Sequence, residues 1–214
     1  MPNLTSNEIL EFRRKKLTHQ ERKAIKLAEK SNNPWDHKSL PRPPRDLVES
    51  AKVKIRDFHL DRTQKSCCYC GRSLRDAEIE TDREHIIPKK DKKGLSYNLF
   101  NLSVSCKRCN MSYKKERTDH IVDFDTIEHD MFNPARYKIP HPNIDTYEDH
   151  IFRFSLQFGR REITTYKRKS EKGRFLYSFV NLRELCVLQL DLAQTGRSVH
   201  DGFRRMFGVS DRGL

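Results

Sequence analysis

The stretch SCKRCN, residues 105–110, contains two cysteines separated by two residues, and the stretch CCYC, residues 67–70, contains a second pair with the same spacing. Each C-x-x-C turn can aim two thiolates at one point, and two such turns complete a tetrahedral shell for Zn²⁺. A closed four-thiolate shell leaves no position for a reacting water, so such a zinc would stabilise the fold. We therefore predict a structural zinc bound by Cys67, Cys70, Cys106 and Cys109, with free buried cysteines as the alternative.

Two further cysteines fall outside this set. Cys68 adjoins Cys67 and could replace it if the first turn were tighter, although the spacing favours Cys67 and Cys70. Cys186 stands alone in an apolar helical stretch and is most simply a core residue. Because five of the six cysteines cluster in one segment, the sequence indicates a metal in a reducing compartment and not a set of disulfides.

Polar residues that could act in catalysis or metal binding lie between and just after the cysteine pairs. In EHIIP, residues 84–88, the two isoleucines predict a buried strand that the proline ends. Lys114 follows Asn110 at a spacing that places both on one face of a helix. The residues of interest are Glu84, His85, Asn98, Asn101, Asn110 and Lys114.

Together these motifs resemble the HNH endonuclease family, in the branch that carries zinc knuckles. The resemblance covers about a quarter of the chain and rests on the two C-x-x-C pairs, EHIIP at 84–88, NL at 101–102 and CKRCN at 106–110. It implies an α+β fold, in which a two-stranded hairpin is crossed by a helix around one divalent metal. Mainly helical N- and C-terminal regions would flank this ββα-metal core.

The resemblance also implies roles for individual residues. His85 would be the general base, Glu84 and Asn110 would bind a catalytic Mg²⁺ or Mn²⁺, and Asn101 would brace the loop between the strands, with Asn98 as a less favoured register. The chain departs from the family in three places: Ser105 replaces an apolar residue, Tyr113 stands where a lysine is common, and KKDKKG at 89–94 replaces a glycine pair.

Elementary chemistry supports the same assignment. A neutral imidazole can take a proton from water near pH 7, and carboxylate and amide oxygens suit a hard cation. Adjacent side chains of a strand face opposite ways, so Glu84 and His85 can serve one site only if the backbone bulges or bends there. The alternative for His85 is an ordinary histidine at the end of a strand, bonded to the backbone.

The charge of the chain points to a nucleic-acid partner. The net charge is +13 and the isoelectric point is near 9.6, and clustered Lys and Arg bind polyanions by releasing counterions. Phosphate contacts of this kind position a duplex without reading its bases. The candidate DNA contacts are Lys89, Lys90, Lys92, Lys93, Lys107, Arg108, Lys114 and Lys115, although the lysine-rich loop at 89–94 could also be a solvated turn.

Three regions follow from these patterns. Residues 1–62 predict charged helices over 7–30 and 46–59 joined by a proline-rich arm. Trp35 of this arm could anchor it on a partner, although packing onto the body is the favoured interpretation. Residues 63–120 would form the HNH core that the resemblance implies. Residues 121–214 predict a hairpin of 151–158 with 161–168, a helix from about 175 to 194 and a last short helix.

The setting and partners are further expectations. The sequence has no apolar signal segment and no run of eighteen apolar residues, which predicts a cytoplasmic protein without a membrane partner. The layout with basic helical flanks is similar to the nuclease subunits of Septu-type and retron-associated anti-phage systems, which act beside an ATPase partner. The leading hypothesis is therefore a DNA-cutting effector of such a defence complex, and the alternative is a non-catalytic zinc-ribbon protein that binds nucleic acid.

Overall fold

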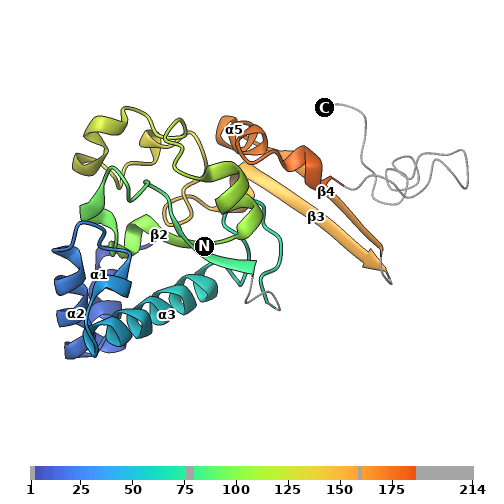
Figure 1. Cartoon of the computed structure of the whole chain (residues 1–214). Helices are drawn as coiled ribbons and strands as arrows, with labels where there is room; N and C mark the ends of the chain where they lie inside the picture. The colour runs from blue at the N-terminus through green and yellow to red at the C-terminus, as the bar shows by residue number, and fades with distance from the viewer. Residues whose placement is uncertain (1–2, 76–79, 159–160, 187–214) are drawn as a thin grey trace, which may run out of the picture.

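The computed structural model describes residues 3–75, 80–158 and 161–186 (Figure 1). Helices and two small two-stranded antiparallel sheets make up the described chain, which confirms the predicted α+β class. Figure 1 shows the N-terminal helices on one side, the first hairpin in the middle and the second hairpin projecting from the other side. No helix within the described residues is long and apolar enough to cross a membrane.

The N-terminal region consists of α1 Ser6–Glu11, continued by η1 Phe12–Lys16, then α2 His19–Glu29, the short η2 His37–Ser39 and α3 Pro44–Arg62. Capping boxes begin α1 and α2. The hydroxyls of Thr5 and Thr18 accept from the backbone amides of Glu8 and Glu21, and the carboxylates of these glutamates accept from the backbone amides of the two threonines. The buried residues of α2 and α3 pack together, and α3 also contacts the first hairpin. The helices predicted over 7–30 and 46–59 are thus confirmed and cover the core hairpin.

The first hairpin pairs β1 Thr81–His85 with β2 Leu102–Cys106, and the pairing runs without a bulge from Thr81 opposite Cys106 to His85 opposite Leu102. Two short turns, η4 Lys93–Leu95 and η5 Leu99–Asn101, lie in the connecting loop. The predicted strand residues Ile86 and Ile87 are fully buried, but they form a bend beyond the strand. Helix η6 Arg108–Lys114 follows β2 directly and completes a ββα unit.

The C-terminal region begins with irregular chain that contains η7 Phe124–His129, η8 Pro134–Arg136 and α4 Tyr147–His150. The predicted second hairpin is confirmed: β3 Ile151–Phe158 pairs with β4 Arg161–Arg168, with Ile151 opposite Arg168. It continues into α5 Glu171–Phe179 and η9 Leu182–Leu185. A β-carbon at Gly173 would lie 1.9 Å from the backbone oxygen of His150, so only glycine allows α5 to approach α4 this closely.

The long helix predicted over 175–194 is wrong within the described residues. Helix α5 starts at Glu171, where the Ser170 hydroxyl accepts from the Gly173 amide, and it ends at Phe179. Asn181 then adopts a left-handed backbone with φ of 45°, which asparagine tolerates better than most residues and which stops an α-helix. The rest of that predicted helix and the last short helix lie outside the described residues.

Candidate active site

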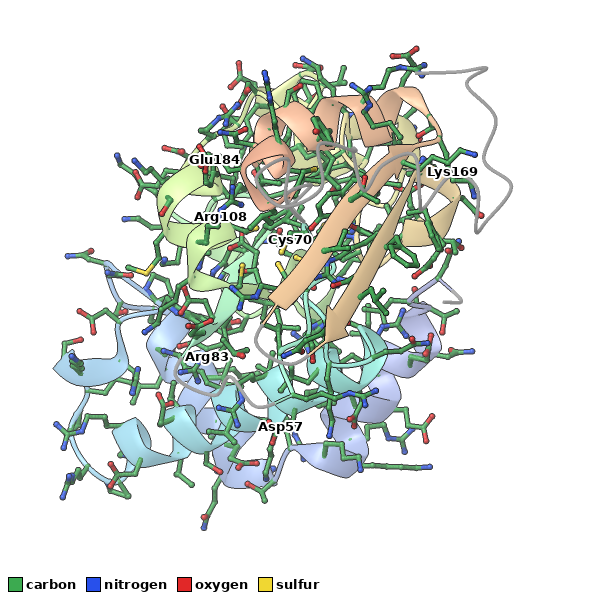
Figure 2. The ribbon with its side chains drawn as sticks, turned by 90° about the vertical axis from the view of Figure 1, so that its right-hand side faces the viewer. Asp57, Cys70, Arg83, Arg108, Lys169 and Glu184 are labelled. Carbon is green, nitrogen blue, oxygen red and sulfur yellow. The ribbon has the colours of Figure 1, made fainter. Side chains whose placement is uncertain are left out.

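The four predicted zinc ligands come together at the centre of the molecule. The Sγ atoms of Cys67, Cys70, Cys106 and Cys109 all lie within 4.8 Å of one another, and all four residues are buried. Figure 2 shows Cys70 where sulfur atoms gather. The Sγ atoms of Cys70 and Cys106 are 3.8 Å apart, which matches the spacing of roughly 3.8 Å that a tetrahedral zinc with bonds of about 2.3 Å requires. The cluster could therefore hold zinc.

Cys68 lies outside this cluster, which agrees with the favoured register of the first turn. Its backbone amide donates to the Val104 carbonyl at 3.0 Å, so the turn is joined to β2 beside the sulfur cluster. Burial raises the pKa of the Cys68 thiol well above its ordinary value, and the thiol is neutral at pH 7. Among the described residues, no other group of three or more His, Cys, Asp or Glu side chains converges as a metal site.

Glu84 points into the protein from β1. Its Oε1 accepts from the Tyr69 hydroxyl at 3.0 Å and lies 3.6 Å from Nζ of Lys114. Its Oε2 is buried and has no hydrogen-bond partner. Burial raises the pKa of Glu84 to about 7, although the charge of Lys114 acts in the opposite direction. A buried carboxylate oxygen without a partner suits a cation ligand.

Asn110 lines the site from η6. Its Nδ2 donates to Oδ2 of Asp82 at 3.2 Å. A carboxylate only accepts, so the amide nitrogen must face Asp82 and the amide oxygen turns away from it. That oxygen is the atom that a hard cation would bind. Asp82 and Glu84 share one face of β1, because side chains two residues apart on a strand point the same way.

The helix turn after Asn110 is wider than an α-helical turn. The Lys115 amide donates to the Asn110 carbonyl at 2.7 Å, five residues back, which is the pattern of a π-helix. This extra residue places Lys114 in the interior, where Nζ donates to the His85 carbonyl at 3.2 Å, and leaves Tyr113 partly exposed. The family commonly has a lysine where this chain has Tyr113. The wider turn places Lys114, one residue later, in the interior and so offsets that departure.

His85 sits at the end of β1 and is only 7% exposed. Its Nε2 lies 3.1 Å from the Ser96 carbonyl, which can only accept, so Nε2 carries the ring proton and Nδ1 has a free lone pair. Burial lowers the pKa of His85 to about 3, and the charges of Lys89, Lys114 and Lys52 add to the effect. The ring is neutral at pH 7, as a general base must be before it takes a proton.

Asn101 braces the loop that leaves β1. It is fully buried, its Oδ1 accepts from the Ile87 amide at 2.7 Å, and its Nδ2 donates to the carbonyls of Ile87 at 3.0 Å and Leu95 at 3.3 Å. Asn98 instead caps η5 by accepting from the Phe100 amide at 3.0 Å. Of the two asparagines, Asn101 is thus the one that fastens both ends of the loop.

Glu84, His85 and Asn110 all line one small open pocket, with a volume of about 70 Å³. The expected bulge within β1 is not found, because the pairing is regular. The chain instead bends at Ile86 and Ile87 directly after His85, so the pocket lies at the end of the strand where opposite faces can both contribute. The other lining residues are Arg83, Pro88, Lys89, Lys90, Lys115 and Glu116.

Residues 67–116 match the family model described as HNH endonuclease. This chain carries an HNH endonuclease domain. The match spans both cysteine pairs, the β1–β2 hairpin and all of η6, and the four-cysteine cluster is consistent with the zinc-knuckle branch. Comparison with curated proteins gave no match, and neither did comparison with solved structures.

The HNH domain does not present all the predicted DNA contacts to solvent. Lys114 is 1% exposed, so its ammonium group serves the protein interior and does not face a DNA backbone. Arg108 binds the carbonyls of Val180 and Asn181 and the carboxylate of Glu184, and Figure 2 shows Arg108 and Glu184 beside one another. Both of these basic groups are used within the fold.

The lysines near the pocket are arranged differently. Lys92 pairs with Glu128 at 3.0 Å and is largely covered, while Lys90 pairs with Glu116 at 3.1 Å in an exposed contact. Lys93, Lys107 and Lys115 are exposed, and Lys89 is partly exposed on the pocket rim. Exposed pairs contribute little to stability, so a phosphate could displace Glu116 from Lys90 at small cost.

Sequence reasoning missed three residues of this site. Asp82, which holds the Asn110 amide, could have been found because it lies two residues before Glu84 on the same strand face. Tyr69, which donates to Glu84, lies inside the first cysteine turn and carried no separate signal. Trp35 contacts His85 from the N-terminal arm, and no pattern in the sequence links the two positions.

Proposed function

We propose that this protein is a metal-dependent endonuclease that hydrolyses DNA phosphodiester bonds in the pocket lined by Glu84, His85 and Asn110. The observation that supports this most is the convergence, inside an HNH domain, of a neutral imidazole with a bare Nδ1 and a buried carboxylate oxygen without a partner. Neither group is needed to hold the strand pairing. Both suit the hydrolysis of a phosphate ester.

In this proposal His85 takes the proton from the attacking water through Nδ1, while its Nε2–H stays on the Ser96 carbonyl. The bound phosphate would raise the pKa of His85 from its low value, since a nearby anion stabilises the charged imidazolium. Lys89 and Lys115 lie on the pocket rim, where they would position the phosphate. Asn101 keeps the loop after His85 in place.

Glu84 and Asn110 fit a hard cation, because they offer a carboxylate oxygen and an amide oxygen to one pocket. When bound, Mg²⁺ or Mn²⁺ would supply positive charge beside the departing 3′ oxygen, leaving a 5′-phosphate product. The four-cysteine cluster would hold a structural zinc that fastens the first turn to the end of β2.

The test is cleavage of supercoiled plasmid by purified protein with Mg²⁺ or Mn²⁺, compared with His85→Ala and with the exposed-histidine control His129→Ala. We expect metal-dependent cutting that falls by about 10²- to 10⁴-fold in His85→Ala, because the general base is lost, and that is unchanged in the control. Binding without cutting by the wild type, at full zinc content and with either metal, would instead support the zinc-ribbon alternative.

We further propose that the nuclease acts in the cytoplasm as the effector of an anti-phage defence complex with an ATPase partner. This rests on the similarity of the basic helical flanks to the nuclease subunits of such systems and on the need to restrain a free nuclease. Co-expression with candidate ATPases and purification by a tag on this chain tests it. A protein that purifies alone and is fully toxic when expressed alone would contradict it.

A further inference from the structure

The proline-rich arm, residues 31–43, reaches the candidate base from outside the HNH domain. The ring centroids of Trp35 and His85 are 4.5 Å apart, with an angle of 85° between the ring planes. Trp35 also lies 5.3 Å from the ring of Tyr97, whose hydroxyl donates to the Pro34 carbonyl at 2.6 Å. Tyr97 therefore contacts the arm both at Trp35 and at the residue before it.

A buried lysine holds Trp35 from the other direction. Lys52 of α3 is 3% exposed, and its Nζ donates to the Trp35 carbonyl at 2.5 Å and lies 4.2 Å from the centroid of the indole ring. A cation over an indole face is attractive, most strongly where water is excluded. Backbone and ring of Trp35 are thus both fixed by one residue of a long helix.

An ion-paired chain joins the arm to β1. His37 of the arm lies 2.8 Å from Lys52 Nζ and 3.1 Å from Oε2 of Glu49, and Oε1 of Glu49 accepts from Arg83 at 3.0 Å. Arg83 precedes Glu84 and His85 on the strand. The arm is therefore tied to the same strand that carries the candidate catalytic residues.

The contact of Trp35 acts on the tilt of the His85 imidazole. The hydrogen bond from Nε2 to Ser96 fixes one atom of the imidazole, but the ring can still tilt about that atom. A perpendicular aromatic ring at this distance restrains the tilt, because edge-to-face packing is one of the arrangements that aromatic pairs prefer and a tilted imidazole would lose it.

We propose that Trp35 is a positioning residue that restrains the tilt of the His85 imidazole, so that its Nε2–H stays on the Ser96 carbonyl and Nδ1 remains the basic nitrogen. The base of the nuclease is then completed by a segment that lies outside residues 67–116. The proposal rests on the proposed function for its catalytic consequence, but the orientation of the ring can be measured without any cleavage. Trp35 itself does not line the pocket.

The first experiment measures the tautomer of the His85 ring directly. Protein labelled with ¹⁵N in histidine is compared as wild type, Trp35→Ala and Trp35→Phe, with Phe152→Ala on the second hairpin as a control for the loss of a half-exposed aromatic. The His85 signals are assigned by their absence in His85→Gln. We expect a single Nε2–H tautomer in the wild type, in Trp35→Phe and in the control, and tautomer exchange in Trp35→Ala.

The second experiment reads catalysis. We expect Trp35→Ala to lower kcat by about 10- to 100-fold, because a misplaced catalytic group costs up to that factor, while KM stays within about threefold. Trp35→Phe keeps an aromatic ring beside His85, so its kcat should stay within about threefold of the wild-type value. A loss confined to KM would overturn the proposal, because it would make Trp35 a nucleic-acid contact.

The outcomes separate the two proposals. If the wild type cuts no nucleic acid, the proposed function fails, and the ¹⁵N signals still decide whether Trp35 orients His85. If Trp35→Ala keeps the single tautomer, positioning by Trp35 is overturned whatever its kcat, while the nuclease stands. If Trp35→Ala does not fold, Trp35→Leu keeps the apolar volume without the ring, and retention of the wild-type tautomer in that variant overturns the proposal.

Discussion

The four-cysteine cluster and the candidate active-site pocket lie in the same 50-residue match to the family model but are built in different ways. The cluster uses one type of ligand from two local turns, and its partners are the other cysteines. The pocket contains a carboxylate, an amide and an imidazole, each with its own neighbours: Lys114 and Tyr69 contact Glu84, Asp82 contacts Asn110, and Ser96 and Trp35 contact His85.

The difference follows from what each centre must do. A structural metal needs only its ligands in place, and a C-x-x-C turn achieves that locally. A catalytic carboxylate must stay buried, ionisable and open on one side, so a cation has to lie close to it without occupying the site. Lys114 meets that requirement only because η6 is wound as a π-helix.

Loss of the cluster should have the largest effect, because both centres depend on it. We expect Cys106→Ser to lose zinc and the cooperative unfolding transition, since binding of a structural zinc is worth about 10 kcal/mol or more. Thermal unfolding together with zinc content measures this. Cys186→Ser, which changes a cysteine outside the cluster, is the matched control and should keep both. Normal unfolding of a zinc-free Cys106→Ser protein would contradict a structural role for the metal.

Removal of Lys114 should be the next largest effect and should be confined to the pocket. Lys114→Met leaves the Glu84 carboxylate buried without its cation, which we expect to cost about 3 kcal/mol at pH 8. An acid whose pKa is raised in the folded state makes the fold lose stability as the pH rises from its unfolded pKa to the raised one. Because Lys114 lowers the pKa of Glu84, that pKa lies above the wild-type value of about 7 in the variant, and the cost should shrink as the pH falls from 8 to 6.

Urea unfolding at pH 8 and pH 6 measures this cost. The double variant Lys114→Met with Glu84→Gln has no buried charge to protonate, and it should recover stability at pH 8 and lose the pH dependence. An equal loss of stability at both pH values in the single variant would show that packing, and not charge, is what Lys114 contributes.

Mild acid should weaken the fold by a smaller amount. Burial lowers the pKa of His59, His85 and His120 to about 3 each. Below their unfolded pKa of about 6.5, these histidines are protonated in the unfolded chain but stay neutral in the folded chain, so the folded state loses stability as the pH falls. Glu84 opposes this, because its raised pKa lets the folded state gain a proton. These three histidines and Glu84 together give a net loss of about 2 kcal/mol between pH 7 and pH 5.5. Burial also lowers the pKa of His141 well below its ordinary value, which adds to the loss.

Urea unfolding across this range, with zinc content followed in parallel, checks the sign. The loss should be smaller by about 1 kcal/mol in His120→Gln, whose side chain keeps an amide donor for the Ile86 carbonyl and does not titrate. Constant or rising stability toward pH 5.5 at full zinc content would contradict neutral buried histidines.

The smallest effect should follow from Asp82, which supports the pocket without lining it. We expect Asp82→Ala to weaken binding of Mn²⁺ to the pocket by about 10-fold, because the Asn110 amide loses the acceptor that sets its direction. Titration of Mn²⁺ followed by electron paramagnetic resonance measures this at constant zinc content. Asp119→Ala, which removes an exposed carboxylate paired with Arg117, is the control and should bind Mn²⁺ normally. Unchanged affinity for Mn²⁺ in Asp82→Ala would show that the direction of the Asn110 amide does not depend on Asp82.

The sequence was informative where a contact is local or where spacing alone encodes it. The helices over 7–30 and 46–59 and the second hairpin follow from periodicity, and the four cysteines follow from two short turns. The first hairpin was expected only from the resemblance to the HNH family. The helix after β4 was predicted too long, because the apolar pattern continues past Phe179 while the left-handed backbone at Asn181 ends the helix. An apolar pattern records burial and does not record where the backbone turns.

The amino-acid sequence by itself determined which groups this protein can use: four thiolates, the acid and histidine at 84–85, two asparagines and a strong positive charge. Only the tertiary structure decided how those groups are used. The π-helical turn brings Lys114 to Glu84, the β1 face brings Asp82 to Asn110, and the N-terminal arm brings Trp35 to His85 across 50 residues of chain. Such contacts depend on where distant segments pack, and burial then sets the charges of the site by removing water from it.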